Sequence, residues 1–419
     1  FKAKMIYNNN MSCHNLSEYL DFKKASESKE YCLSKNIIYK KQGKFVVFKY
    51  NKKNINSENV TTLGLFRSVI YDTQADRIVC YSPPKSHSME EFTSNNSPTD
   101  CTFKEFVEGT MINVFYDNSD SEWRITTKTM IGASFKYFQD ADKSFSEMFY
   151  EAVAAYPNFS INDLNKEYCY SFVLQHPDNR IVVPLSEKSL YCIAVYKCLY
   201  DDDNNQHLVM NETNDMLKTI RCSKPLNFSE VANFDDKFAV WDYAKYYFLN
   251  NILDYKIKGI VISNKMDNGK RFKIINPTYN DVKSLRGNST KLQFQYLSLR
   301  QSGKVKDYLK YFPESKTKFM TFRDSLHKWT NDLYNLYIIC FIHKKKHVND
   351  CPYQYRPHLM ALHKMYLSSL SGEKIKINFA RVVKYANSLE PARLMYSLNY
   401  NLRKVKVEEI KNQHETLKA

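Results

Sequence analysis

Two histidines and a cysteine in the last third of the chain have a spacing that could bind zinc. His343 and His347 are four residues apart, and Cys351 follows four residues later. Histidines at this spacing share one face of a helix and can ligate the same ion. However, three lysines lie between the two histidines, and no acidic residue stands where a general base would be needed. We therefore expect no metal site.

The same segment suits phosphate chemistry better, because its lysines are followed by aromatic residues and an arginine. Basic side chains hold phosphates and tyrosines stack on bases, and Tyr353 and Tyr355 lie close by in the sequence. A surface loop whose tyrosines pack inward would give the same pattern. The candidate nucleic-acid-binding residues are Lys344, Lys345, Lys346 and Arg356. No glycine-rich phosphate loop and no Gly-x-Ser-x-Gly motif is present.

Positive charge is concentrated in this last third. The 419 residues include 61 Lys and Arg against 45 Asp and Glu, a net charge of +16. Residues 291–419 hold 24 basic and 10 acidic residues, whereas residues 1–290 hold 37 and 35. The C-terminal part thus carries a net +14. This asymmetry favours a polyanionic partner, although a solvated helical surface is the alternative.

The spacing of apolar residues differs between the two parts of the chain that must position these residues. Before about residue 290, short segments rich in β-branched and aromatic residues predict strands. Polar loops are expected at 86–100 and 201–206. The predicted strands are 45–48, 65–70, 77–81, 111–116, 123–127, 170–174, 181–184, 190–196, 259–263 and 272–275. After that point, apolar residues recur every three or four positions at 319–340, 359–370 and 379–389, which predicts helices.

Composition limits the class of protein. Hydrophobic residues make up 43% and aromatic residues 15%, which excludes a disordered chain. The ten cysteines are scattered without a Cys-x-x-Cys pair, and no signal peptide precedes them. No apolar run approaches the roughly 20 residues of a membrane span. We therefore expect an intracellular protein with reduced thiols and no membrane contact.

An ordered series of segments resembles the adenylyltransferase domain of bacteriophage-type RNA ligases, within the covalent nucleotidyltransferases. The resemblance covers about residues 40–290, and its most specific part is His-Pro-Asp-Asn-Arg-Ile-Val at 176–182. Paralogues in giant DNA viruses look closer still, because they share the Glu-Gly-Thr of 108–110 and an ending like 391–396. A helical C-terminal domain also fits this group. The segments that carry the series are 65–72, 106–117, 170–183, 257–262 and 271–275.

The residues that carry catalysis in this family are replaced here. In active members a Lys-x-Asp-Gly motif supplies the amine that attacks the ATP α-phosphate and forms lysyl-AMP. The resemblance places Phe106 at that nucleophile position. It places Val173 at the glutamate that holds the ribose, and Lys258 at a glutamate that serves metal and phosphate. Three such losses indicate a degenerate active site in which no catalytic residue is expected.

Other positions of the family pattern are retained. Lys273 matches a phosphate-neutralising lysine, and Arg67 matches an upstream arginine. The resemblance therefore implies a residual nucleotide-binding pocket made of Arg67, Glu108, Gly109, Lys258 and Lys273. Lys104, two residues before Phe106, is the candidate for a relocated nucleophile. In a strand it would lie on the same face but roughly 6–7 Å away, whereas attack geometry tolerates errors of about 1 Å.

Together these features predict an α+β protein. Residues 1–290 form an RNA-ligase-like nucleotidyltransferase domain with antiparallel sheets, with its motifs within 60–290, and residues 291–419 form a basic, all-helical domain. The expected function is that of a viral pseudoenzyme that binds nucleic acid, RNA rather than DNA, or a viral protein assembly, in the host cytoplasm or the virion. An active ATP-dependent RNA ligase with a relocated lysine, and a virion protein that keeps only the fold, are the alternatives. No cofactor is expected; ATP and Mg²⁺ belong to the enzyme alternative.

Overall fold

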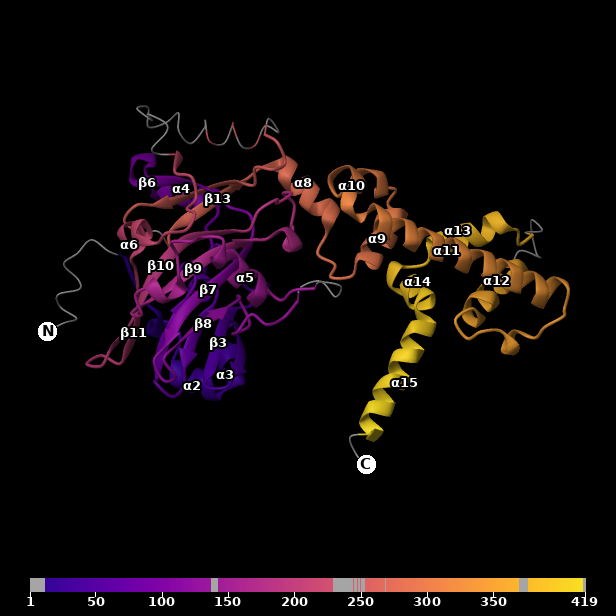
Figure 1. Ribbon diagram of the computed structural model, residues 1–419, viewed down its shortest axis with the longest axis horizontal. Coiled ribbons are helices and arrows are strands. Elements are labelled where there is room, and N and C mark those ends of the chain that lie inside the picture. The colour runs from indigo at the N-terminus through magenta and orange to yellow at the C-terminus, as the bar shows by residue number, and fades with distance from the viewer. Residues whose placement is uncertain are drawn as a thin grey trace. The chain divides into compact units, whose positions relative to one another are not determined.

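The protein divides into two compact units, Phe1–Lys283 and Ser284–Ala419. The computed structural model describes residues 12–136, 142–228, 244, 247, 249, 253–267, 269–368 and 376–416. We call the two units the N-terminal and C-terminal units and describe each by itself (Figure 1). Among these described residues, no helix is both long enough and apolar enough to cross a membrane.

The N-terminal unit contains three antiparallel sheets in its described part. A six-stranded sheet has the order β1-β11-β10-β9-β7-β8, a four-stranded sheet the order β2-β3-β4-β5, and a three-stranded sheet the order β13-β12-β6. The strands are β1 (Cys13–Asn15), β2 (Ile37–Gln42), β3 (Phe45–Tyr50), β4 (Val69–Asp72), β5 (Arg77–Tyr81), β6 (Cys101–Glu105), β7 (Thr110–Asp117), β8 (Glu122–Thr126), β9 (Tyr168–Gln175), β10 (Ser189–Asp201), β11 (Gln206–Asn211), β12 (Gly259–Asn264) and β13 (Arg271–Ile275).

The six-stranded sheet is buried on both faces. In β7, Phe115 packs into one core together with the four-stranded sheet, while Ile112 and Val114 pack into a second core on the opposite face. Successive residues of a strand point to opposite faces, so this strand feeds both cores. The second core is covered by α5 (Phe145–Ala154), which contacts β9 and β10 and lies over the sheet in Figure 1.

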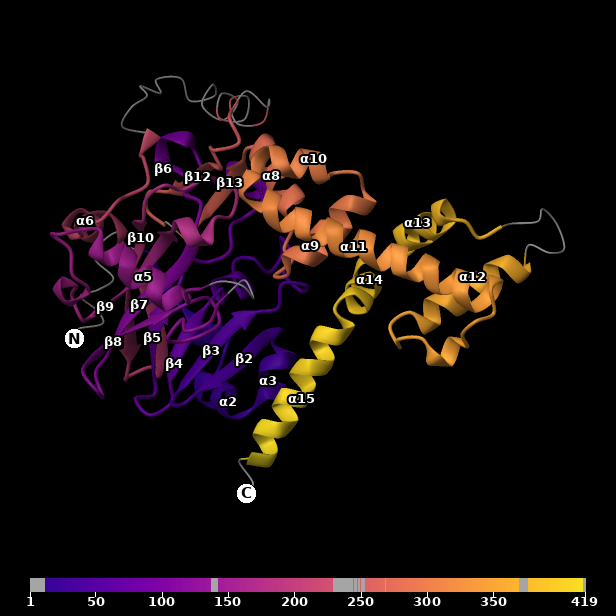
Figure 2. The ribbon, with the colours of Figure 1, turned by 45° about the vertical axis from the view of Figure 1, so that its right-hand side comes forward.

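Further helices cover the remaining sheets. In Figure 2, α3 lies beside β2 at the edge of the four-stranded sheet. The three-stranded sheet has a core of its own, into which α4 inserts Phe92. The helices of this unit are α2 (Phe22–Glu27), α3 (Lys29–Ser34), α4 (Met89–Asn95), α5 and α6 (Thr213–Thr219); α8 (Pro277–Arg286) spans the boundary between the units.

Most predicted strands are confirmed, including β5 with its predicted bounds and the β7–β8 hairpin. Three predictions were wrong. The strand expected at 65–70 begins only at Val69, because the chain first forms a short 3-10 helix over Leu63–Leu65. The loop expected at 86–100 contains α4, whose N-terminus is capped by the Ser88 side chain accepting a hydrogen bond from the Glu91 N–H. The strand expected at 181–184 is a bend, because the backbone N–H groups of Val182 and Val183 bond to a side chain instead of a neighbouring strand.

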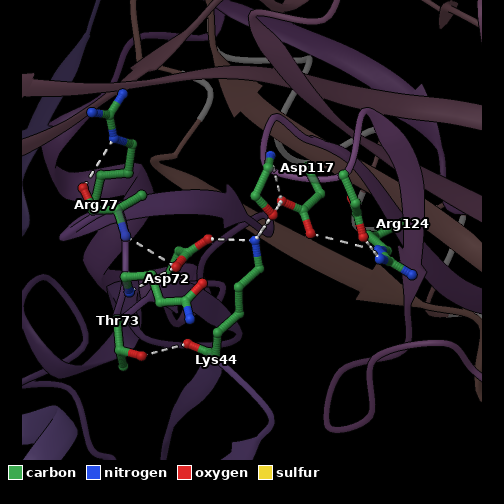
Figure 3. A network of polar contacts seen from close by, with 10 residues as sticks. Lys44, Asp72, Thr73, Arg77, Asp117 and Arg124 are labelled. Atoms are coloured by element: carbon green, nitrogen blue, oxygen red, sulfur yellow. Dashed lines mark hydrogen bonds and ion pairs between the residues drawn. The ribbon is translucent and has the colours of Figure 1, made fainter.

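A buried ion network joins the four-stranded sheet to the β7–β8 hairpin (Figure 3). The Lys44 ammonium lies 3.1 Å from Asp72 Oδ2 and 2.6 Å from Asp117 Oδ1. Both aspartates are only 3% exposed. The other oxygen of Asp117 lies 3.6 Å from Arg124 Nε. Because paired charges are strongly coupled when they are buried, this network fixes the packing of one sheet against the other.

In its described residues, the C-terminal unit has helices joined by loops and no strand. Its long α11 buries Phe319, Leu326, Trp329 and Leu333 along one stripe, which confirms the predicted core face of 319–340. The predicted helices at 359–370 and 379–389 correspond to α12 and α13. The helices are α9 (Leu292–Gln301), α10 (Val305–Tyr311), α11 (Lys316–Tyr337) with a π-helical end (Ile338–Ile342), α12 (Arg356–Ser368), α13 (Phe379–Ser388), α14 (Pro391–Leu398) and α15 (Tyr400–Thr416). The α+β class, with antiparallel sheets followed by helices, is therefore confirmed.

Candidate functional site

The segment 106–109 links the three-stranded sheet to the six-stranded sheet, between the end of β6 and the start of β7. The Phe106 N–H donates to the Gly259 carbonyl at 3.0 Å, which extends the pairing of β6 with β12 by one bond. Gly109 has φ +150°, and a Cβ there would lie 2.4 Å from the Leu174 carbonyl oxygen. Only glycine fits this close approach to β9.

A cavity of about 190 Å³ lies beside this segment and is lined by residues of both sheets. The residues that the family resemblance singled out meet here, although they are spread over two hundred positions of sequence. Lys104 of β6 lies opposite Val261 of β12 and lines the same cavity. The predicted residues along its wall are Arg67, Lys104, Phe106, Gly109, Val173, Lys258 and Lys273.

Phe106 stands beneath two lysines. The Lys258 ammonium lies 3.7 Å from the centroid of the Phe106 ring and that of Lys273 lies 4.5 Å from it, both within the range of a cation–π contact. Lys258 also donates to the Val107 carbonyl at 3.1 Å. At the position that the resemblance assigned to the family's lysine, the aromatic face of Phe106 therefore contacts two other ammonium groups.

Burial disfavours the charged form of both lysines. It lowers the pKa of Lys258 to about 8, although the nearby Glu108 carboxylate acts in the opposite direction. The pKa of Lys273 is lowered well below its ordinary value by burial first, and then by Arg271 and Arg67. Like charges gathered in a half-buried space repel one another, so the cavity is poised to accept an anion.

Arg271 was missed by the sequence analysis although it belongs to the same site. It lies on β13 two residues before Lys273, so both side chains face the cavity. Its Nη2 donates to the Pro84 carbonyl at 2.7 Å, and burial lowers its pKa to about 10. The alternation of side chains along the strand was the signal that could have identified it.

Glu108 has a different position from the one expected. Its side chain is 4% exposed and does not line the cavity. Oε1 accepts hydrogen bonds from the N–H groups of both Val182 and Val183 at 3.0 Å. The carboxylate therefore holds the bend after β9, and this is why the strand predicted at 181–184 does not form.

The described wall of the cavity does not fit a divalent cation. Among the described residues, its one lining carboxylate is Glu105, whose Oε2 accepts a hydrogen bond from the Leu226 N–H at 3.3 Å. Where the resemblance expects glutamates, Val173 offers no ligand and Lys258 offers a positive charge. Mg²⁺ requires oxygen ligands, so these residues would repel it, whereas they suit phosphate. Across the described residues, no group of three or more His, Cys, Asp or Glu side chains could hold a metal ion.

The basic patch of the C-terminal unit lies at the surface. Lys344, Lys345 and Lys346 are exposed on the turn that follows the π-helical end of α11. Lys346 and Arg356 line one cleft of about 530 Å³, so the structure brings the two ends of the predicted patch together.

The two tyrosines of this patch point in different directions. Tyr353 is 58% exposed. Tyr355 is buried, and its hydroxyl donates to Asp332 Oδ2 at 3.2 Å. Only Tyr353 is therefore available to a ligand.

The cavity and the patch can be set beside known proteins. No protein-family model matches the sequence. An RNA ligase of Rhodothermus phage RM378 is 34% identical over 98 residues, 22% of this chain and 22% of that protein. An immediate-early protein ICP-46 homolog of invertebrate iridescent virus 3 is 23% identical over 265 residues, 60% of this chain and 53% of that protein. The chain thus matches about a fifth and about half of these two relatives' lengths.

Among solved structures, an archaeal ATP-dependent RNA ligase aligns with 70% of this chain and 69% of its own at a TM-score of 0.32 and 10% identity. The phage and iridovirus sequences confirm the relationship that the motifs indicated. The chain is similar to RNA-ligase-like nucleotidyltransferases, and both of the sequence relatives named here are viral proteins.

Proposed function

We propose that this RNA-ligase-like chain does not adenylylate itself and acts instead as a binding protein for nucleic acid, RNA in preference to DNA. One observation carries the proposal: the ammonium groups of Lys258 and Lys273 lie over the ring of Phe106, the residue that the family resemblance aligns with the nucleophile. A phenyl ring cannot form a phosphoramide bond. The two viral relatives support a viral origin, and we propose that the protein acts inside the host cell or in the virion.

We expect the cavity to bind phosphate even though the lysine nucleophile is absent. Arg67, Lys258, Arg271 and Lys273 surround the cavity and would hold a phosphate group by charge and hydrogen bonds. Binding of the adenine and the ribose is less favoured. Val173 offers the ribose no hydrogen-bond acceptor, and the cavity volume of about 190 Å³ is below the roughly 300 Å³ of the smallest typical small-molecule sites. The cavity is therefore suited to a terminal phosphate without its nucleoside.

Nucleic-acid binding by the C-terminal unit rests on charge and exposure. Fluorescence anisotropy with a labelled single-stranded RNA, measured against salt, tests it. Each phosphate contact contributes about −0.7 to the slope of log affinity against log salt for single strands. Replacing Lys344, Lys345 and Lys346 by glutamate should flatten the slope by about 2 or more. A slope near zero for the unaltered protein, or one that the triple variant leaves unchanged, would contradict this part of the proposal.

A second candidate function is supported by the lowered pKa of a cavity lysine. With a pKa of about 8, Lys258 has more free amine near neutral pH than an ordinary lysine, which is how proteins activate lysine nucleophiles. Lys104 faces the same cavity. An adenylyl group found on either residue after exposure to ATP and a divalent cation would make the protein a divergent ligase. A protein that binds neither RNA nor phosphate would instead be a virion component that keeps only the fold.

A further inference from the structure

Three segments of the C-terminal unit bring aromatic and cationic side chains into one continuous row. Tyr353 precedes α12, Tyr396 lies in α14, and Tyr400 begins α15. The rings of Tyr353 and Tyr400 are stacked, with centroids 5.5 Å apart and planes at 23°. Tyr396 meets Tyr400 edge to face at 6.2 Å. The three rings therefore form a connected aromatic surface.

An arginine stands at each end of this row. The Arg356 guanidinium lies 5.7 Å from the centroid of Tyr353, and that of Arg403 lies 4.8 Å from the centroid of Tyr396. Among the residues that the structure describes, neither guanidinium forms an ion pair with a carboxylate. We call these five residues, Arg356, Tyr353, Tyr400, Tyr396 and Arg403, the tyrosine–arginine row.

The row is accessible. The exposed fraction is 58% for Tyr353 and 46% for Tyr396, values that buried packing would not leave to such large rings. Exposed aromatic rings carry binding energy when a flat partner covers them, and a nucleobase presents a π-face of any sequence. A base can therefore stack here without a hydrogen-bonding code.

Arg356 joins this row to the basic cleft. The cleft of about 530 Å³ is lined by Lys346, His347 and Arg356, so Arg356 belongs both to the cleft and to the row of tyrosines. A nucleic-acid strand alternates between charged phosphates and flat bases. The net charge of +14 over residues 291–419 provides a positive electrostatic potential that attracts the negative phosphates of such a strand.

We propose that the tyrosine–arginine row is a stacking platform for the unpaired bases of single-stranded nucleic acid, with the backbone phosphates held by Lys346 and Arg356 in the adjoining cleft. The inference rests on the proposed nucleic-acid binding and deepens it, because it names single strands as the preferred form. Bases in a duplex are already stacked and hide their faces, so a platform of rings discriminates against them.

The test compares a fluorescein-labelled RNA of mixed sequence with the same strand annealed to its complement. The single strand should bind more tightly. The double variant Tyr353→Leu, Tyr396→Leu should lose about 5- to 160-fold in affinity for it if the two rings together stack one base, since stacking contributes about 1–3 kcal/mol per base. Its salt slope should not change, because no charge is removed. Tyr353→Phe with Tyr396→Phe should retain the affinity, since phenyl rings still stack.

A matched control is Tyr150→Leu, which removes a 48% exposed tyrosine from α5 of the N-terminal unit and should leave RNA binding unchanged. Circular dichroism checks that the exposed substitutions leave the fold intact. Salt-dependent RNA binding that is equal for single and double strands, or unaffected by the double leucine variant, would overturn the platform and leave the proposed function standing. Absence of any RNA binding would overturn both.

Discussion

Replacing Phe106 by leucine should destabilise the protein in a way that depends on pH. Leucine keeps an apolar side chain in the cavity but removes the ring face on which Lys258 and Lys273 rest at 3.7 and 4.5 Å. A cation–π contact is worth about 0.5–1 kcal/mol when exposed and about 2 kcal/mol when desolvated. Both lysines are half-buried, so we expect a loss of about 1–2 kcal/mol in the free energy of unfolding while the lysines are charged.

The pH dependence follows from the pKa of Lys258, which is about 8 in the folded protein. The ring stabilises the ammonium and not the free amine. Its contribution is therefore complete below that pKa and is lost as the pH rises through it. Without the ring, the pKa of Lys258 should fall further, by roughly 0.7 units for each 1 kcal/mol lost.

Urea unfolding of the unaltered protein and of Phe106→Leu at about pH 6 and about pH 10 measures the effect. The difference between the two proteins should be largest at the lower pH and shrink at the higher. Phe172→Leu provides the control, because Phe172 is fully buried in the core under α5 and its loss acts through apolar packing. A Phe106→Leu deficit that is the same at both pH values would refute the cation–π account of the site.

Two further substitutions and one pH titration test what stabilises the fold. Gly109→Ala should cost more than about 3 kcal/mol in the free energy of unfolding, because the new Cβ would lie 2.4 Å from the Leu174 carbonyl oxygen. The control Gly43→Ala, at φ +60° with no atom near the new Cβ, should cost only about 1 kcal/mol. Equal losses in urea unfolding would contradict this. Lys44→Met should cost about 3–5 kcal/mol by leaving Asp72 buried without a cation and Asp117 with Arg124 alone, while Met at the exposed Lys41 should be neutral in the same assay. His358 is 1% exposed, and burial lowers its pKa from 6.5 to about 4. As the pH falls, the unfolded chain binds a proton at this histidine before the folded protein does, so up to about 3 kcal/mol of stability should be lost between pH 6.5 and pH 4. An NMR titration that places the pKa of His358 near 6.5 would disprove this.

Local patterns predicted most strands and helices because their burial follows the sequence period. The β7–β8 hairpin and the stripe of α11 are such cases. The failure at 181–184 arose because a distant carboxylate, Glu108, takes the backbone N–H groups that a strand would need. By contrast, α4 could have been found, since Ser88 and Glu91 have the Ser-x-x-Glu spacing of a helix N-terminus.

The residues of the cavity were predicted through a family resemblance, and only the structure shows what they do to one another. Phe106 and Lys258 are far apart in sequence, and no pattern indicates that the lysine lies over the ring. The tyrosine–arginine row was likewise invisible, because Tyr353 and Tyr396 come together only through the packing of α12, α14 and α15. Arg271 was the exception, since the alternation along β13 already placed it beside Lys273.

The central claim is that the chain has lost the covalent step of the ligases it resembles. Intact-mass spectrometry after incubation with ATP and Mg²⁺ or Mn²⁺ tests it most directly. We expect the mass to remain that of the unmodified chain, because Phe106 has no amine to adenylylate. A mass increase of one adenylyl group that disappears in Lys104→Ala or Lys258→Ala would contradict the account and establish a relocated nucleophile.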